Sequence, residues 1–260
     1  MPQTYKKYLK IDELLALQQP LSDDPEHDEM LFIITHQVYE LWFKQIIHEL
    51  ADFQSSLAQK NLPIAIRNLK RVLHILKVLV AQMDIIETLS PVSFRAFRDR
   101  LESASGFQSV QFREIEFMLG RRNPSVFAHY PPGLAARERL ESLMQQPSLW
   151  DTFLHCLNDS GYPIPDSELM RDVSTSPQLN QAVQQQLIKI YRDESLLTQL
   201  CEHLIDLDEG LQEWRYRHIK MVERTIGNKI GTGGSVGVDY LYKTLLTPLF
   251  PDLWAIRNAL

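Results

Sequence analysis

The stretch that most constrains this chain is residues 27–53, which contain neither glycine nor proline. Nothing inside it interrupts a helix. Apolar residues recur there at helical spacing on two neighbouring faces, and a helix that is apolar on most sides is usually buried. The stretch therefore predicts one long helix, buried on most sides. Between Met30 and Phe43 the stretch is apolar nearly all round, and Glu40 and Lys44 on the remaining face have the i,i+4 spacing of an ion pair.

His36 falls on the aromatic side of this helix, one turn after Phe32. From the residues alone, two interpretations of His36 remain open. It is either a core histidine whose polar atoms are satisfied by a neighbour, or the one polar group on the aromatic wall of a pocket.

The rest of the chain also predicts helices. Ser90 followed by Pro91 is typical of a helix start, while Gly120 and Gly227 are typical of residues just past a helix end. No alternating apolar pattern is long enough to predict a strand. The sequence thus predicts an all-α fold, a single domain over residues 1–260 built of long antiparallel helices. Beyond the first stretch, helices are expected at residues 11–17, 64–89, 91–101, 107–119, 134–145, 148–157, 179–192, 196–226, 238–247 and 252–259, with loops at 121–133 and 161–177.

Composition and charge disfavour several classes of protein. The chain has 260 residues, enough for one domain with a substantial core, and its formal net charge of −6 opposes general nucleic-acid binding. No apolar run is long enough to span a membrane, and the start lacks the apolar core of a signal peptide. Two cysteines, Cys156 and Cys201, fit a reduced protein without a disulfide framework. We therefore expect a cytoplasmic protein with no nucleic-acid or membrane partner.

His218 is the second histidine with an informative setting. Its neighbours at helical spacing are apolar: Leu211, Trp214, Met221 and Val222. Cations lie close in sequence: Arg215, Arg217 and Lys220. Such a face suits a non-covalent haem, because the imidazole can bind iron and the cations can meet the propionates. The alternative is another core histidine, on a basic helix.

Other motifs are weaker. The chain has no Glu-x-x-His or His-Glu-x-x-His motif, which disfavours a non-haem metal centre. The glycine-rich stretch 231–237 lacks the Lys-Ser/Thr of a phosphate-binding loop; it either folds over a small polar ligand through Thr232 and Ser235 or is a plain connector. Arg98, one turn after Phe94, is either a carboxylate-binding residue or part of a surface ion pair.

Seven motifs occur in order along the chain with compatible spacing. They are Tyr5-Lys-Lys-Tyr8-Leu9, Asp28-Glu-Met-Leu-Phe32-Ile-Ile-Thr-His36-Gln, Glu40-Leu-Trp-Phe-Lys44, Phe97-Arg98-Asp-Arg-Leu, Ser105-Gly-Phe-Gln-Ser109, Trp214-Arg-Tyr-Arg-His218 and Gly231-Thr-Gly-Gly-Ser-Val-Gly237. Together they resemble the tryptophan 2,3-dioxygenase family, and the resemblance extends from Tyr5 to the C-terminal helices.

This resemblance implies an all-α, indoleamine/tryptophan dioxygenase-like fold around a haem pocket and a cytoplasmic homotetramer. It implies one haem b per subunit, ferrous in the active state. The implied reaction converts L-tryptophan and O2 to N-formyl-L-kynurenine, the first step of the kynurenine pathway.

The resemblance also assigns roles to residues around the cofactor. His218 matches the proximal ligand of the haem iron, and His36 matches the distal catalytic histidine that contacts the indole N–H. Ser105 and Gly106 match the chain break over the distal haem face.

The remaining assignments concern the substrate. Phe32 matches an aromatic wall, Arg98 the partner of the substrate carboxylate, and Thr232 a hydroxyl near its amino-acid end. Phe94 stands where some bacterial members carry tyrosine, which implies one polar contact fewer. Residues 1–20 match a segment that completes the pocket of a neighbouring subunit, through Tyr5, Tyr8 and Leu9.

Three other functions remain open at this point. One is a haem enzyme of the same fold that acts on another indole or on a pyrrole. The second is a haem-based sensor without turnover. The third is a helical interaction protein without a cofactor.

Overall fold

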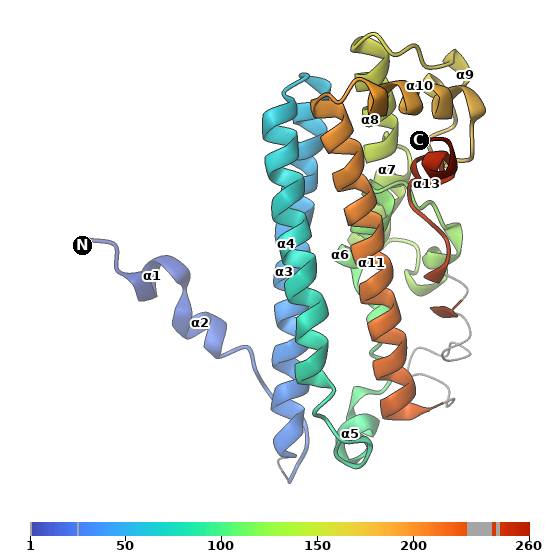
Figure 1. Cartoon of the computed structure of the whole chain (residues 1–260). Helices are drawn as coiled ribbons and strands as arrows, with labels where there is room; N and C mark the ends of the chain where they lie inside the picture. The colour runs from blue at the N-terminus through green and yellow to red at the C-terminus, as the bar shows by residue number, and fades with distance from the viewer. Residues whose placement is uncertain (1, 25, 228–240, 243–244) are drawn as a thin grey trace.

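The computed structural model describes residues 2–24, 26–227, 241–242 and 245–260. Every regular element among these residues is a helix, which confirms the predicted all-α fold. Three long helices lie alongside one another (Figure 1): α3 (His27–Ala58), α4 (Leu62–Ile86) and α11 (Leu196–Ile226). The shorter α-helices are α1 (Tyr5–Leu9), α2 (Ile11–Leu15), α5 (Pro91–Arg98), α6 (Val110–Met118), α7 (Ala135–Met144), α8 (Leu149–Asp159), α9 (Asp166–Leu169), α10 (Gln181–Arg192) and α13 (Pro251–Ala255). The 3₁₀ helices are η1 (Asp99–Leu101), η2 (Gly106–Gln108), η3 (Pro124–His129) and η4 (Ile256–Ala259).

Helix α4 is the common partner of the other two long helices, since α3 and α11 both pack mainly against it. The predicted antiparallel arrangement holds for α3 and α4. The Tyr39 hydroxyl on α3 donates to the Leu79 carbonyl on α4 over 2.7 Å, and Arg71 donates to Glu49 over 2.7 Å. The residue numbers of the two helices therefore change in opposite directions along their contact.

Helix α11, by contrast, runs parallel to α4. Arg217 donates to Asp84 over 2.7 Å, and further along both helices Arg224 donates to Glu87 over 3.4 Å. The intervening helices α5 to α10 return the chain to the end where α4 began (Figure 1). As a result, the C-terminal ends of α4 and α11 meet the N-terminal end of α3.

The expectation that α3 is buried on most sides is wrong. Met30, Ile34 and Leu41 on α3 are 37%, 42% and 52% exposed. The buried stripe of the helix includes Thr35, Tyr39, Phe43, Ile46 and Leu50. Helical periodicity in a sequence identifies apolar faces, but it does not say whether a face packs within the same chain.

The predicted helix signals are mostly confirmed. The Ser90 hydroxyl accepts from the Ser93 N–H over 3.0 Å at the start of α5, and Pro91 follows. The predicted helix at 107–119 is shorter than expected, because η2 precedes α6 and Ser109 begins a new helix there. The predicted loops at 121–133 and 161–177 contain η3 and α9, and α1 was not predicted. The predicted helix at 238–247 lies largely outside the described residues.

The shorter helices build the rest of the core. One hydrophobic cluster contains side chains from α3 through η4, including the fully buried Phe53, Phe97, Trp150 and Phe250. A second, smaller cluster forms where η3 and α7 meet α6. Among the helices of the described ranges, none is long and apolar enough to cross a membrane.

Gly120 ends α6 in a Schellman motif, as its sequence position predicted. Its N–H donates to the Phe117 carbonyl over 3.0 Å, and the Arg121 N–H donates to the Glu116 carbonyl over 2.9 Å. The φ angle of Gly120 is +100°, and a Cβ atom there would lie 3.2 Å from Ser148 Oγ. The backbone angle therefore favours glycine, and a Cβ atom would also require Ser148 at the start of α8 to shift by a few tenths of an ångström.

We predict that Gly120→Ala lowers the free energy of unfolding by about 2–3 kcal/mol, because it adds a steric conflict to a left-handed backbone. Gly133→Ala is the matched control, since Gly133 has a φ of +85° but, apart from its chain neighbours, no atom of the described residues lies within 4 Å of its Cβ position. It should cost only about 1–2 kcal/mol. Urea denaturation measures both, and equal losses would show that the approach to Ser148 is unimportant.

Candidate active site

A cavity of about 320 Å³ lies where α3, α4, α5, α6 and α11 meet. Its size is within the range of small-molecule sites. Met83 and Ile86 on α4 form part of its wall, so the helix that holds α3 and α11 also borders the space between them. Much of the remaining wall is aromatic: Phe32, Tyr39, Phe43, Phe94, Phe107, Phe112 and Trp214.

His36 projects from α3 into this cavity and keeps an exposed surface there. Its Nδ1 atom lies 2.7 Å from the Phe32 carbonyl oxygen, which can only accept. Nδ1 therefore carries the proton and donates, which leaves Nε2 of the neutral ring as an acceptor. Burial lowers the pKa of His36, although the Phe32 carbonyl and Glu40 oppose the shift. The geometry favours the pocket interpretation of His36 over the core interpretation.

His218 faces the same cavity from α11. Its ring stacks on Trp214, with centroids 5.5 Å apart and planes 12° apart. Burial, and to a lesser degree the nearby His36, lowers the pKa of His218 to about 4. The imidazole is therefore neutral at physiological pH, as a metal ligand must be.

Helix α5 presents different residues to the core and to the cavity. Phe97 is fully buried in the core, while Phe94 and Arg98, one turn apart, line the cavity. The Phe32 ring lies 5.8 Å from Phe94 and 5.5 Å from Phe97, measured between centroids. Arg98 thus places a guanidinium beside an aromatic wall.

Glu40 connects α3 to the turn that precedes α6. It accepts from the Ser109 hydroxyl over 2.6 Å and from Gln111 Nε2 over 2.8 Å. The expected pair with Lys44 does not form, because the Glu40 carboxylate points to these donors instead. The bonds hold η2, with Ser105 and Gly106 on the cavity wall, against α3.

We call a further part of the wall the arginine end; it consists of Arg113, Arg121 and Arg215 around the buried carboxylate of Glu116. Arg215 donates to Glu116 Oε1 over 2.9 Å, Arg113 donates to Oε2, and Arg121 Nε lies 3.8 Å from Oε1. Three guanidinium groups thus lie around one carboxylate. Burial lowers the pKa of Arg215 to about 10, against the effect of Glu116.

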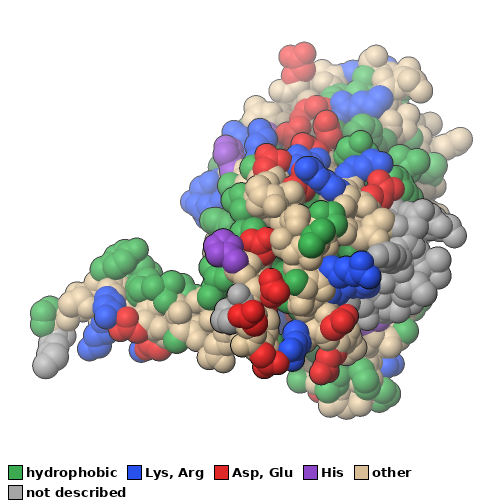
Figure 2. Space-filling model, turned by 90° about the horizontal axis from the view of Figure 1, so that it is seen from below, with side chains coloured by type: hydrophobic (Ala, Val, Ile, Leu, Met, Phe, Trp, Pro, Cys, Tyr) green, Lys and Arg blue, Asp and Glu red, His purple; other side chains and the backbone are tan. Residues whose placement is uncertain are grey.

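Of the site residues expected from sequence, the structure brings seven together around this cavity: Phe32, His36, Phe94, Arg98, Ser105, Gly106 and His218. It does not bring Tyr5, Tyr8 and Leu9 there. These three side chains are exposed on α1, which with α2 forms an arm that extends away from the body of the molecule (Figures 1 and 2). Thr232 lies outside the described residues.

Two further expectations concern charge and metal. Of the three cations near His218, only Arg215 lines the cavity; Arg217 pairs with Asp84, and Lys220 pairs with Glu223. Across the part of the chain that the structure describes, no three His, Cys, Asp or Glu side chains form a group that could hold a metal ion.

Sequence reasoning missed Glu40 as a connecting residue and most of the arginine end. The i,i+3 spacing of Arg113 and Glu116 on α6 was a signal for an ion pair. The sequence gives no comparable signal that Arg121 and Arg215 also lie beside Glu116, because Arg215 is about a hundred residues further along the chain.

Fold and site together define an all-α protein with a histidine- and aromatic-lined pocket of the size of a small-molecule site. The sequence model of the family "Tryptophan 2,3-dioxygenase" matches residues 1–148 and 174–260. A tryptophan 2,3-dioxygenase of Herpetosiphon aurantiacus is 58% identical over 99% of this chain and 98% of its own length. The enzymes of that name from Anaeromyxobacter sp. strain K and Bacillus cereus strain ZK are 54% and 43% identical, over 99% of this chain and 96% and 92% of their own lengths. The chain belongs to the tryptophan 2,3-dioxygenase family.

Proposed function

We propose that this protein is a haem-dependent dioxygenase that inserts O2 across the indole C2–C3 bond of L-tryptophan and forms N-formyl-L-kynurenine, the first step of the kynurenine pathway. The observation that carries this proposal is the convergence of seven expected site residues, from four separate parts of the chain, on one cavity. Family membership supports the same reaction.

The cavity residues fit haem b. His218 offers a neutral imidazole, and no residue of the described chain forms a hydrogen bond with its ring in this structure. The aromatic walls suit a flat porphyrin, and the guanidinium groups of the arginine end suit two propionates. We therefore assign His218 as the iron ligand and the arginine end as the propionate site, with Ser105 and Gly106 lining the distal side. When bound, ferrous haem supplies the activation of O2.

The protein's own groups bind and orient the substrate. The Nε2 atom of His36 is an acceptor, and the indole N–H of the substrate can donate a hydrogen bond to it. Phe32 and Phe94 provide apolar surface for the indole ring. Arg98 provides a charge-assisted partner for the substrate carboxylate. His36 holds the indole by a hydrogen bond and does not deprotonate it, because the indole N–H is a very weak acid.

Water exclusion is the second contribution of the chain. Most of the cavity wall is apolar, and Glu40 fixes the Ser105–Ser109 turn against α3. Apolar surroundings strengthen the interactions of His36 and Arg98 with the substrate, because fewer water dipoles compete with them.

We propose that the protein works as a homotetramer in the cytoplasm, with residues 1–260 as one domain. The exposed apolar side chains Met30, Ile34 and Leu41 on α3 support assembly with other copies. So does the arm, on which Tyr5 and Tyr8 are 76% and 71% exposed. In this proposal, Tyr5, Tyr8 and Leu9 complete the pocket of a neighbouring subunit, and Thr232 contacts the amino-acid end of the substrate.

The proposed reaction is tested by turnover. Protein reconstituted with haem and reduced should convert L-tryptophan to N-formyl-L-kynurenine in aerated buffer, as followed by absorbance.

His218→Ala should lose stable haem binding, because it removes the iron ligand; a normal haem spectrum in this variant would refute the assignment. Haem binding without product would favour another indole or pyrrole substrate, or a sensor.

We predict that Arg98→Ala lowers kcat/KM for L-tryptophan about 10- to 100-fold, because a charge-assisted contact with the carboxylate is lost. Haem absorbance should not change. Arg95→Ala is the matched control: Arg95 lies on the same helix but is exposed and does not line the cavity. Its kcat/KM should stay within about twofold of the original value. Equal effects of both substitutions would contradict the role of Arg98.

Deletion of residues 1–10 should lower kcat/KM while leaving haem content unchanged, since the arm would act at a neighbouring subunit's pocket. Steady-state kinetics and sedimentation of the truncated protein measure activity and assembly together. Full activity in the truncated protein would rule out this role for Tyr5, Tyr8 and Leu9.

A further inference from the structure

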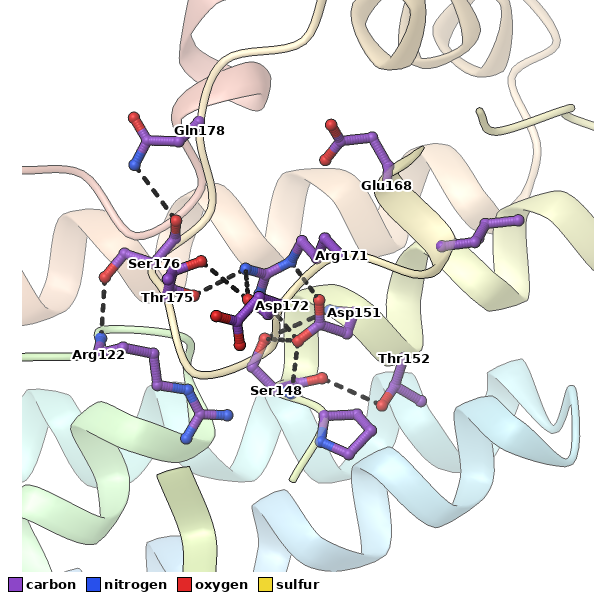
Figure 3. A network of polar contacts seen from close by, with 12 residues as sticks. Arg122, Ser148, Asp151, Thr152, Glu168, Arg171, Asp172, Thr175, Ser176 and Gln178 are labelled. Atoms are coloured by element: carbon purple, nitrogen blue, oxygen red, sulfur yellow. Dashed lines mark hydrogen bonds and ion pairs between the residues drawn. The ribbon is translucent and has the colours of Figure 1, made fainter. Parts of the chain in front are cut away.

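A second polar network lies outside the cavity, where α8 meets the connection between α9 and α10 (Figure 3). Asp151 is its centre. The carboxylate accepts from Ser148 N and Oγ, each over 2.7 Å, and from Arg171 Nε and NH2 over 2.6 and 3.0 Å. Arg171 in turn donates to the Thr175 carbonyl over 2.7 Å. Asp151 and Arg171 are nearly buried, so this network fixes the course of residues 171–176.

Arg122 joins this network to the chain beside the cavity. Its backbone N–H donates to Ser176 Oγ over 2.9 Å. Its buried guanidinium donates to the carbonyls of Leu143 and Gln146, each over 2.6 Å, at the C-terminal end of α7. A cation is favoured there by the helix dipole, which offsets part of the cost of burial. That cost is visible as a pKa of Arg122 lowered to about 10 by burial.

The two neighbours of Arg122 both line the cavity. Arg121 belongs to the arginine end, and Asn123 forms the adjoining wall while its side chain caps η3. On the preceding side, Gly120 lies against Ser148, which belongs to the same network. The residues before and after Arg121 are therefore both held by contacts with this network: Gly120 lies against Ser148, and Arg122 is bonded to Ser176.

We propose that Arg122 is a positioning residue for the proposed cofactor site. Held by Ser176 and by the end of α7, it fixes the backbone that carries Arg121 and Asn123 at the arginine end. This inference rests on the proposed function, in which the arginine end receives the carboxylates of the cofactor. The network that anchors it includes Asp151 and Arg171, which lie in the stretch 149–173 that the family's sequence model does not match.

The test uses two substitutions and one control. Arg122→Met removes every donor of the guanidinium but keeps a long apolar side chain, and Ser176→Ala removes only the bond to the Arg122 N–H. Arg257→Met is the control, because Arg257 also makes charge-assisted bonds, to Glu202 and Tyr191, but does not line the cavity. Cofactor-free protein is titrated with haem and, separately, with haem dimethyl ester, which lacks the two carboxylates. Amide hydrogen exchange of residues 119–126 is measured on the same samples by mass spectrometry.

We expect Arg122→Met to weaken haem binding about tenfold and to weaken ester binding less than about twofold, since only the carboxylate contacts depend on Arg121. Ser176→Ala should also weaken the binding of haem and of the ester, but each by a smaller factor than Arg122→Met does. Residues 119–126 should exchange faster in both variants, and Arg257→Met should affect neither measurement.

Equal weakening of haem and ester, unchanged exchange at 119–126, or the same effects from Arg257→Met would each overturn the inference. Wild-type protein that binds neither porphyrin would instead refute the proposed function. In that case the exchange measurement alone decides whether Arg122 holds the segment.

Discussion

The structure depends on one packing arrangement, in which α3 and α11 both lie against α4. Their contacts are fixed by buried bonds such as Tyr39 to the Leu79 carbonyl and by apolar side chains along α4. Because α3 and α11 both pack mainly against α4, His36 and His218 face a shared space beside it. The parallel direction of α4 and α11 brings their C-terminal ends to this space. The cavity is therefore a consequence of helix order and direction, and the histidines occupy its walls.

The sequence predicted the parts of the site that lie on one helix. A histidine one turn from an aromatic residue implies a shared face, and this was sufficient for His36 with Phe32 and for Arg98 with Phe94. The sequence did not predict where Glu40 would bind, since an i,i+4 lysine was available and the Ser109 hydroxyl was 69 residues away. The arginine end could not be predicted from local sequence patterns either, because its residues come from α6, from the turn after α6 and from α11. The exposure of α3 was mispredicted for a related reason: an apolar face looks the same in sequence whether it packs inside the chain or is left for another one.

The polar groups of the site divide into two kinds. His36 and His218 are neutral because burial opposes their protonation, so their ring nitrogens can interact with a ligand without a charge. The carboxylates of Glu40 and Glu116 instead accept hydrogen bonds from other side chains of the protein. Glu40 fixes the Ser105–Ser109 turn, and Glu116 binds the arginines around it. Acidic groups thus shape the cavity, while His36 and His218 line its wall as neutral groups.

The arginine end has a consequence for the coupling of ligand binding and stability. Three guanidinium groups around Glu116 repel one another, and burial of Arg215 adds a desolvation cost that lowers its pKa to about 10. A ligand with two negative charges would relieve the repulsion and replace lost water contacts with charge-assisted bonds. Such a ligand binds the folded chain but not the unfolded one, so it must raise the free energy of unfolding, by about 2.7 kcal/mol at a concentration of about 100 times Kd. An anionic ligand at this cluster would therefore stabilise the fold, and Arg121 lies between two residues, Gly120 and Arg122, that are held by contacts with Ser148 and Ser176.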